Sequence, residues 1–223
     1  MARRTARSVT MVSTRLRYRV RTEGVPPDAG PGSRLPGAVG AQQTVASARR
    51  LASTLLRPLP DRWRHTMGVA ARAAELADTV PPRDRSILVA AAWLHDIGYS
   101  PSIQDSGFHP VDGARFLRRE GWPERICGLV AHHSGADFMA RATGHEEAIL
   151  EFAFEGSPVS DALSYADQTV GASGQRLRLE DRLADTLRRH GPGSAQARVY
   201  YIRAPYLRAA ADRVRQRFCR TVG

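Results

Sequence analysis

The sequence contains no lysine and has few cysteine and aromatic residues. Its two cysteines, Cys127 and Cys219, cannot form a disulfide framework, and such low usage is typical of a reducing compartment. Aromatic residues make up 7% of the chain, and alanine and leucine outnumber valine and isoleucine, which favours helices over sheets. The longest apolar run, Ile87–Leu94, is far shorter than the ~20 residues needed to cross a bilayer. These absences argue against disulfide-rich and membrane-spanning classes and predict a cytoplasmic, helical protein.

The absence of lysine also changes how the net charge of +11 is interpreted. All 33 basic residues are arginine, which indicates the codon bias of a GC-rich genome rather than selection for phosphate contacts. Residues 1–60 contain 11 arginines against Glu23 and Asp28, a balance of +9, whereas residues 61–223 are at +2. Because residues 24–40 (GVPPDAGPGSRLPGAVG) are rich in proline and glycine, we predict a disordered basic leader over residues 1–40. Only this leader offers nucleic acid a non-specific surface, so a nucleic-acid partner is not favoured.

Residues 45–223 predict one all-α domain, with a core over about residues 61–170 and a C-terminal helical extension. Apolar residues recur at helical spacing, and no stretch alternates with the period of two that strands require. We expect Asp61 to cap the start of a long helix and Gly98 to close the next helix. The expected helices cover residues 46–56, 61–77, 83–97, 110–119, 123–133, 146–154, 158–170, 180–190 and 195–219.

The most apolar of these helices ends in a titratable pair, His95 and Asp96, directly behind the run ILVAAAWL. Burying a carboxylate there is costly unless it is paired or coordinates a metal ion. Neighbouring helical side chains point about 100° apart, so both residues can converge on one ion only where the helix ends. Taken alone, the pair could equally interact with the helix dipole and cap the following turn.

The pair is part of a longer pattern of histidine and aspartate residues. RWRHTMGVAARAAELA supplies His65, WLHDIGY supplies His95 and Asp96, and ALSYADQTV supplies Asp167. This order resembles the HD-domain superfamily of metal-dependent phosphohydrolases, in which a first histidine, a His-Asp pair and a distant aspartate lie on helices. The resemblance implies an HD-domain helical bundle whose first metal ion is held by these four residues, with Asp161 as the alternative to Asp167.

Three further histidines resemble those of HD members that have a two-metal centre. GFHPVDGARFL supplies His109, and ICGLVAHHSGA supplies His132 and His133, as in the HD-GYP group and in dinucleoside-polyphosphate hydrolases. The resemblance implies a second ion held by His109, His132 and His133, with Asp96 bridging the two ions.

Two positions depart from the family pattern. Ser134-Gly135-Ala136 replaces the Gly-Tyr-Pro signature after His133, which disfavours cyclic di-GMP cleavage. Many HD motifs have a lysine three residues after the aspartate, where this chain has Tyr99. A mechanism that needs a cation at this point is therefore in doubt, although a tyrosine can still donate a hydrogen bond.

Imidazole and carboxylate ligands suit Mn²⁺, Fe²⁺, Ni²⁺ or Zn²⁺ better than Ca²⁺. Such an ion lowers the pKa of its bound water and offsets charge on phosphate oxygens. We expect two ions, with Asp96, His109 and His132 as the catalytic candidates, because a protonated histidine could assist the leaving oxygen.

The remaining residues of interest are expected to have structural or surface roles. His145 and His190 lie in polar segments and are expected at the surface, while Cys127 lies among apolar residues and is expected in the core. Arg115, Arg118 and Arg119 could steer a phosphate, but a solvated helix face is favoured for these three arginines.

The favoured function is hydrolysis of a phosphoester or phosphoanhydride, most simply of a nucleotide, by metal-activated water. A phosphodiesterase for a cyclic nucleotide or an alarmone is the alternative within enzymes. A non-catalytic module that senses a ligand through the metal site is the alternative from another class. The expected partner is a small phosphorylated molecule, and no membrane partner is expected.

Overall fold

The computed structural model describes residues 38–222, and this part of the chain is all-α, as predicted. Short 3₁₀ turns at Ala77–Thr79, Pro82–Asp84, Ile97–Tyr99 and His133–Gly135 connect several of the helices. The helices are α1 (Ala38–Leu56), α2 (Pro60–Glu75), α3 (Arg85–Leu94), α4 (His109–Arg119), α5 (Glu124–His132), α6 (Ala136–Thr143), α7 (Glu146–Ile149), α8 (Pro158–Gln168), α9 (Leu179–His190) and α10 (Ala195–Val222).

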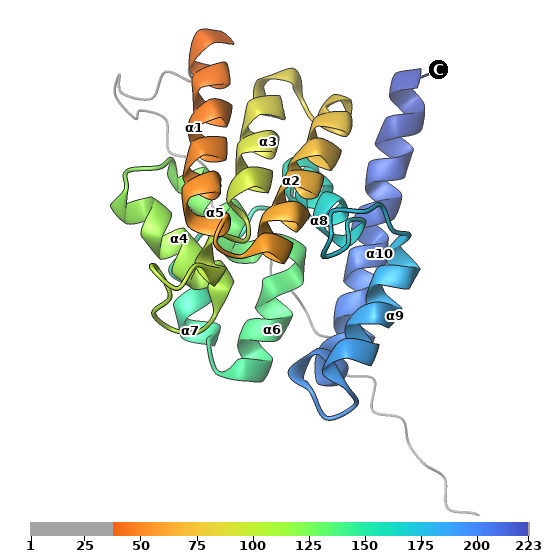
Figure 1. The fold of residues 1–223 in the computed structure, drawn as a ribbon. Coiled ribbons are helices and arrows are strands. Elements are labelled where there is room, and N and C mark those ends of the chain that lie inside the picture. Colours follow the sequence, from red (N-terminus) through yellow and green to blue (C-terminus); the bar gives the residue numbers. More distant parts are fainter. Residues whose placement is uncertain (1–37, 223) are drawn as a thin grey trace, which may run out of the picture. The chain divides into compact units, whose positions relative to one another are not determined.

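Helix α3 is the central element of the fold. It packs against α1 and α2, which lie beside it in Figure 1, and also against α5 and α8. Its apolar run lets it do so, because Leu88, Ala90, Ala91, Ala92 and Leu94 are all fully buried. Three consecutive alanines carry little side-chain bulk, so neighbouring helices can approach closely on several faces. The C-terminus of α3 is therefore deep inside the protein, where His95 and Asp96 follow.

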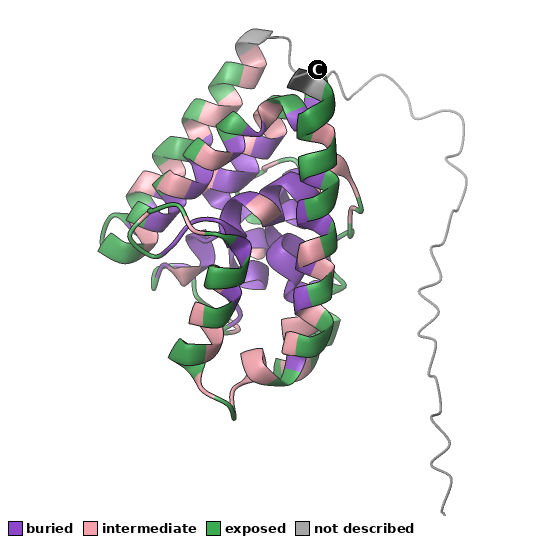
Figure 2. Cartoon of the chain, turned by 90° about the vertical axis from the view of Figure 1, so that its right-hand side faces the viewer, coloured by how far each residue is buried: buried purple, intermediate pink, exposed green. Residues whose placement is uncertain are grey.

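Two apolar clusters share α3, and a third lies beyond it. The first joins α3 to α1, α4 and α5, and the second joins α3 to α2, α8 and α10. The third cluster packs α9 on α10 through Leu183, Leu207 and neighbours. Figure 2 shows buried residues on the inward faces of the helices and exposed residues on the outward faces. The structure thus anchors α9 and α10 to the same bundle that carries the His-Asp pair.

The helix boundaries differ from the prediction at both capping residues. Helix α2 begins at Pro60, with Leu59 at the N-cap, so Asp61 lies within the first turn rather than capping it. Proline suits the first helical position because its missing N–H has no intrahelical partner there. Gly98 does not end α3, which stops at Leu94, but lies in the next 3₁₀ turn.

The reason for a glycine at position 98 is the close approach of α4. A Cβ atom at this position would lie 2.0 Å from the carbonyl oxygen of His109. Only a hydrogen fits in that space, so Gly98 lets the start of α4 pack directly against the turn that follows the His-Asp pair.

Three other segments differ from the prediction. Helix α1 begins at Ala38 instead of residue 46, and α6 occupies a segment for which no helix was predicted. Helix α6 forms because Ser134 (φ 53°) and Gly135 (φ 68°) break the helix direction after α5 and allow a new one to start. Helix α7 ends at Ile149 instead of residue 154, and Phe152 beyond it packs into the first cluster.

The predicted leader, residues 1–40, lies almost entirely outside the described residues. Within the part of the chain that is described, no helix combines the length and apolarity needed to cross a membrane.

Candidate metal centre

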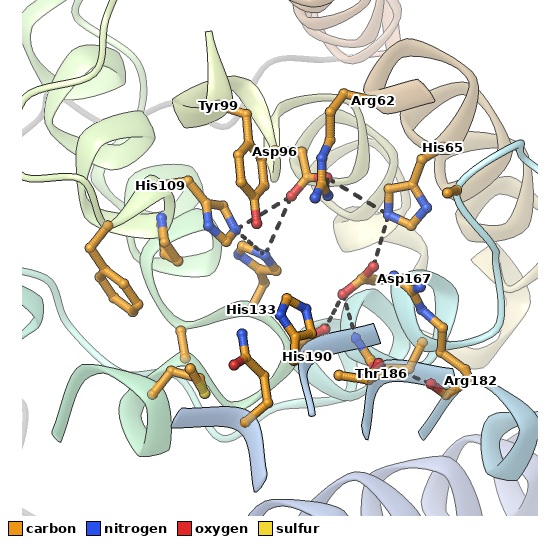
Figure 3. Close-up of a pocket in the computed structure, with 18 of the residues that line it drawn as sticks. Arg62, His65, Asp96, Tyr99, His109, His133, Asp167, Arg182, Thr186 and His190 are labelled. Atoms are coloured by element: carbon orange, nitrogen blue, oxygen red, sulfur yellow. Dashed lines mark hydrogen bonds and ion pairs between the residues drawn. The ribbon is translucent and has the colours of Figure 1, made fainter. Parts of the chain in front are cut away.

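Six of the seven predicted ligand residues come together, and five of them line a cavity of about 520 Å³, with His95 fully buried behind them. His65 lies on α2, Asp167 lies on α8, and His95 and Asp96 follow α3. Figure 3 shows the side chains of Asp96, His109, His133, His65 and Asp167 pointing toward one another from separate helices. Their ring nitrogens and carboxylate oxygens form two groups, each compact enough to hold a metal ion.

The first group consists of His65, His95 and Asp167. Nε2 of His65 lies 3.0 Å from Oδ1 of Asp167 and 3.4 Å from Nε2 of His95. All three side chains are buried, and His95 is fully inaccessible. The donor atoms therefore converge on one point from α2, α8 and the end of α3.

The second group consists of Asp96, His109 and His133. Nε2 of His109 lies 3.4 Å from Nε2 of His133 and 3.4 Å from Oδ1 of Asp96. His109 is the first residue of α4, which Gly98 allows to lie against the turn after α3. The second group is thus built from three chain segments that meet at the end of α3.

Asp96 faces both groups with different oxygens. Its Oδ2 lies 3.5 Å from Nε2 of His95 and 3.8 Å from Nε2 of His65, whereas its Oδ1 lies toward His109 and His133. A carboxylate whose two oxygens face different donor groups is suited to bridge two neighbouring cations.

The histidines are oriented by hydrogen bonds at the ring nitrogen remote from the centre. Nδ1–H of His65 donates to the carbonyl oxygen of Gly171 at 3.1 Å. Nδ1–H of His95 donates to Ala92 at 2.8 Å, and that of His133 donates to Val130 at 2.7 Å. Such bonds fix the tautomer and leave Nε2 with a lone pair that points to the centre.

The positions of the protons on the histidine rings favour a metal ion at the centre. Because His65 and His95 both use Nδ1 as the donor, their Nε2 lone pairs face each other at 3.4 Å and cannot form a hydrogen bond. Two buried acceptors in that arrangement repel each other unless a cation or a proton lies between them. The donor set, imidazole nitrogens with carboxylate oxygens, suits a divalent transition metal.

The electrostatics favour the same ligand forms at most of these residues, but not at His65, where burial lowers the pKa and Asp167 raises it overall. Burial lowers the pKa of His95 and, more strongly, that of His109, which keeps both rings neutral. Burial alone would raise the pKa of Asp96, but His95, Arg62 and His109 together hold it well below its usual range. Neutral imidazole and ionised carboxylate are the forms that bind metal ions.

Asp167 is held in place on its other side. Its Oδ2 accepts a hydrogen bond from the hydroxyl of Ser134 and another from Nε2 of Gln168 at 2.8 Å. Asp161, the alternative considered for this role, instead forms ion pairs with Arg213 and Arg217. The geometry therefore places Asp167, and not Asp161, among the candidate ligands.

His132 differs from the expectation, because the structure does not bring it into either group. Its Nδ1 lies 3.0 Å from Oδ1 of Asp137, and its Nε2 lies 2.9 Å from the carbonyl oxygen of Phe152. Both partners are acceptors, so both ring nitrogens carry protons and no lone pair remains for a metal ion. Burial opposes this charge, but Asp137 raises the pKa of His132 overall.

Arg62 is a member of the site that sequence analysis missed. It lies three residues before His65 and therefore on the same face of α2. Its NH1 donates to Oδ2 of Asp96 at 3.0 Å, and its guanidinium lies 3.8 Å from the ring centre of Tyr99. The i, i+3 spacing from His65 is the signal that could have identified it.

Tyr99 lies between Arg62 and His109. The ring of His109 stacks on Tyr99 with centroids 3.9 Å apart, and Figure 3 shows the Tyr99 hydroxyl directed toward the centre. Burial, together with the charge of Asp96, raises the pKa of Tyr99 to about 12. The hydroxyl therefore stays protonated, while Arg62 places a positive charge next to Asp96.

A buried carboxylate fixes the loop that leads into His109. Asp112 accepts hydrogen bonds from the backbone N–H of Ser106 at 2.8 Å, from its hydroxyl at 2.6 Å and from the N–H of Gly107 at 3.1 Å. These bonds hold the residues before α4 against its first turn and so fix the position of His109, the first residue of that helix.

The residues expected outside the site mostly lie there. Arg115 pairs with Glu151, Arg118 pairs with Glu124, and Arg119 lies near Phe116, while Cys127 is buried in the first apolar cluster. His145 is half-buried, stacked on Phe108 with a centroid distance of 4.9 Å. His190 is exposed as expected, but its side chain lines the cavity.

The fold and these groups define a class of protein, namely a helical bundle with a histidine- and aspartate-rich centre suited to metal ions. The family model described as "HD domain" matches residues 62–186, more than half of the chain. The chain belongs to the HD-domain family.

Two curated proteins are similar to part of this chain, and both are named tRNA (cytidine(56)-2'-O)-methyltransferase. The protein from Picrophilus torridus is 33% identical over 107 residues, which is 48% of this chain and 27% of that protein. The protein from Thermoplasma volcanium is 32% identical over 122 residues, 52% of this chain and 33% of that protein. This chain therefore spans a third or less of the length of these relatives. No solved structure matches it.

Proposed function

We propose that this protein is a metal-dependent phosphohydrolase that cleaves a phosphoester or phosphoanhydride of a nucleotide. The observation that carries the proposal is the pair of adjoining donor groups, with the two oxygens of Asp96 divided between them. Divalent ions held close together in this way lower the pKa of bound water and offset charge on both the attacking and the leaving oxygens.

In this proposal His65, His95 and Asp167 would hold one ion, His109 and His133 would hold the other, and Asp96 would supply one oxygen to each group. His132 is left out because both of its ring nitrogens are used as donors to Asp137 and Phe152. The relevant metals are Mn²⁺, Fe²⁺, Ni²⁺ and Zn²⁺, which accept this mixture of imidazole and carboxylate.

Two side chains next to the centre have roles in binding the phosphate. Arg62 brings a permanent positive charge to the carboxylate face, so it can neutralise a phosphate oxygen that approaches Asp96. The hydroxyl of Tyr99 remains protonated because its pKa is about 12, so it can donate a hydrogen bond to a phosphate or leaving oxygen. Together they supply the cation and the donor for which the family pattern uses a lysine.

The test combines elemental analysis with a phosphate-release screen over a nucleotide panel. We expect wild-type protein to contain two divalent ions per chain and Asp96→Ala to lose most of them together with all hydrolysis. Asp105→Ala is the matched control, because Asp105 is an exposed aspartate on the loop before α4. Equal metal content in wild type and Asp96→Ala would contradict the proposal. Metal binding without phosphate release from any nucleotide would favour a ligand-sensing module.

The names of the curated relatives suggest tRNA as a second kind of ligand. Methyl transfer is not proposed for this chain, since it spans a third or less of those proteins. Residues 1–35 contain eight arginines against Glu23 and Asp28, a charge that could contact a phosphate backbone. A gel-shift titration with tRNA, at two salt concentrations and with and without these residues, would test for that contact.

A further inference from the structure

The cavity wall opposite the metal centre is built by α9 and α10 and is rich in basic and neutral polar side chains. Arg182, Thr186 and His190 are spaced four residues apart on α9, so they lie along one face of the helix. Figure 3 shows all three at the cavity. Helix α10 adds Gln196 and Arg203, seven residues apart on one face, and all five residues line the cavity.

Arg182 has no partner for much of its guanidinium. Its Nε and NH1 atoms are buried and make no hydrogen bond. The side chain extends from α9 toward the region of Asp167 and His65 in Figure 3. A guanidinium stays charged in proteins, and a buried charge without a partner is unfavourable. A ligand that carries negative charge would remove this cost.

Arg203 lies on the same wall and also has no carboxylate partner among the described residues. Nε of Arg203 donates to the carbonyl oxygen of Ser134 at 2.9 Å, and its side chain forms no other hydrogen bond with residues 38–222. Burial lowers the pKa of Arg203, Asp167 opposes this, and the like charge of Arg182 lowers it further. The two arginines are therefore close enough to repel each other across the wall.

Among the described residues, no carboxylate of the cavity forms an ion pair with Arg182 or Arg203, and Asp61 pairs with Arg64. Oδ1 of Asp167 faces His65, while its Oδ2 accepts from Ser134 and Gln168. Asp96 is turned toward Arg62 and the histidines. The two arginines on this wall therefore lack an ion-pair partner within the part of the chain that the structure describes.

We propose that Arg182 and Arg203 form an anion site for a second phosphate of the substrate, separate from the phosphate that reacts at the metal centre. The inference rests on the proposed function and narrows it. The substrate is a nucleotide with at least two phosphate groups, either joined as an anhydride or attached to different carbons. Guanidinium groups bind phosphate oxygens through paired, charge-assisted hydrogen bonds, and the amide of Gln196 adds a neutral donor on the same wall.

The anion site is tested first without metal or catalysis. Metal-stripped, full-length protein is titrated with inorganic phosphate by isothermal titration calorimetry. Without metal, Arg62 is paired with Asp96 and the two ionised aspartates of the centre repel phosphate, so we expect one ion per chain on the α9–α10 wall. Arg182→Gln should weaken binding by about tenfold or more, as expected for loss of a hydrogen-bonded charge.

Arg188→Gln removes the same charge from the exposed face of α9 and should leave the affinity unchanged. Arg203→Lys keeps a charge but loses the paired donors, and should bind phosphate more weakly than wild type. Circular dichroism establishes that each variant is folded. Equal phosphate affinity in wild type and Arg182→Gln, or no binding by wild type, would overturn the assignment.

The substrate class is tested with metal-loaded protein and three compounds: adenosine 5′-monophosphate, adenosine 5′-diphosphate and adenosine 3′,5′-bisphosphate. We expect a higher kcat/KM for one of the two-phosphate compounds, and the one preferred shows how the phosphates are linked. Arg182→Gln should abolish that preference mainly through KM. A wild-type preference for the monophosphate would refute the inference. If no compound is hydrolysed, the proposed function fails, while the phosphate titration still decides whether the anion site exists.

Discussion

Removing the metal ions should lower the thermal stability of this protein by an amount set by the number of ions and by how far their concentration exceeds their Kd. The Nε2 lone pairs of His65 and His95 face each other at 3.4 Å, and Nε2 of His109 lies equally close to Nε2 of His133. A bound ion replaces each repulsive contact with coordination. An ion at a hundred times its Kd adds about 2.7 kcal/mol, so two ions add about 5 kcal/mol. For a domain of this size that corresponds to a rise in Tm of about 10–20 °C.

The assay is thermal unfolding followed by far-ultraviolet circular dichroism while Mn²⁺ is titrated into chelator-treated protein. Two adjacent histidines provide a matched pair of variants. His133→Gln should remove one ion, leaving about half of the metal-induced rise in Tm. His132→Gln should start from a lower Tm, because two buried hydrogen bonds are lost, yet show the full rise on adding metal.

The comparison between these neighbours decides whether the reasoning holds. If both variants lose the same part of the metal-induced rise in Tm, His132 also binds metal, and its pairing with Asp137 and Phe152 does not exclude it from the centre. If wild-type protein shows no rise in Tm with any of the four metals, the facing lone pairs are not a metal site. Elemental analysis of each sample ties the shift in Tm to the number of ions bound.

Three further outcomes are expected. His132 has a raised pKa in the folded state, so its pairing with Asp137 stabilises the protein in acid and this stabilisation is lost as pH rises. Asp137→Asn should therefore lower the free energy of unfolding by about 1.5 kcal/mol near pH 5 and by little near pH 9, as measured by urea unfolding. Asp112→Asn should cost about 1–3 kcal/mol and weaken the second ion more than the first, as measured by metal titration. Gly98→Ala should destabilise the protein by about 1–3 kcal/mol or more and displace His109, as measured by unfolding and by metal content. An unchanged ion count would contradict the inference that Gly98 positions the start of α4.

The sequence alone predicted the part of the site that depends on local pattern. An acid directly behind the apolar run of α3 could only be accommodated with partners, and the structure supplies them to Asp96 from α2, α4 and the end of α5. The helical class followed in the same way from composition and spacing. These features depend on neighbours in the chain, which a sequence displays directly.

The choice between His132 and His133 could not be made in this way. Adjacent residues on a helix point about 100° apart, so which of them faces the centre depends on where α5 ends. In the structure His132 is the last helical residue, and the chain turns at His133, whose ψ is 147°. A shift of that boundary by one residue would exchange their roles, and helix boundaries are the least certain feature of a sequence pattern.

The arginines of the cavity were hidden for a different reason. With 33 arginines and no lysine, the composition gives no means of distinguishing Arg182 and Arg203 from solvated surface residues. What distinguishes them is that their guanidinium groups are at least partly buried without a carboxylate partner among the described residues, whereas Arg213 and Arg217 pair with Asp161. Such a property depends on tertiary packing and has no trace in local sequence.

Ser134 illustrates how a departure from a family pattern can have its own physical role. In the sequence it marks only the missing Gly-Tyr-Pro signature. In the structure its φ of 53° is unfavourable for a residue with a side chain, and such strain persists only where the surroundings fix it. Its hydroxyl donates to Asp167, its N–H donates to Ser164 and its carbonyl accepts from Arg203. One strained residue thus links a candidate metal ligand to the arginine wall, so the position of the proposed second phosphate depends on the same turn that orients the metal centre.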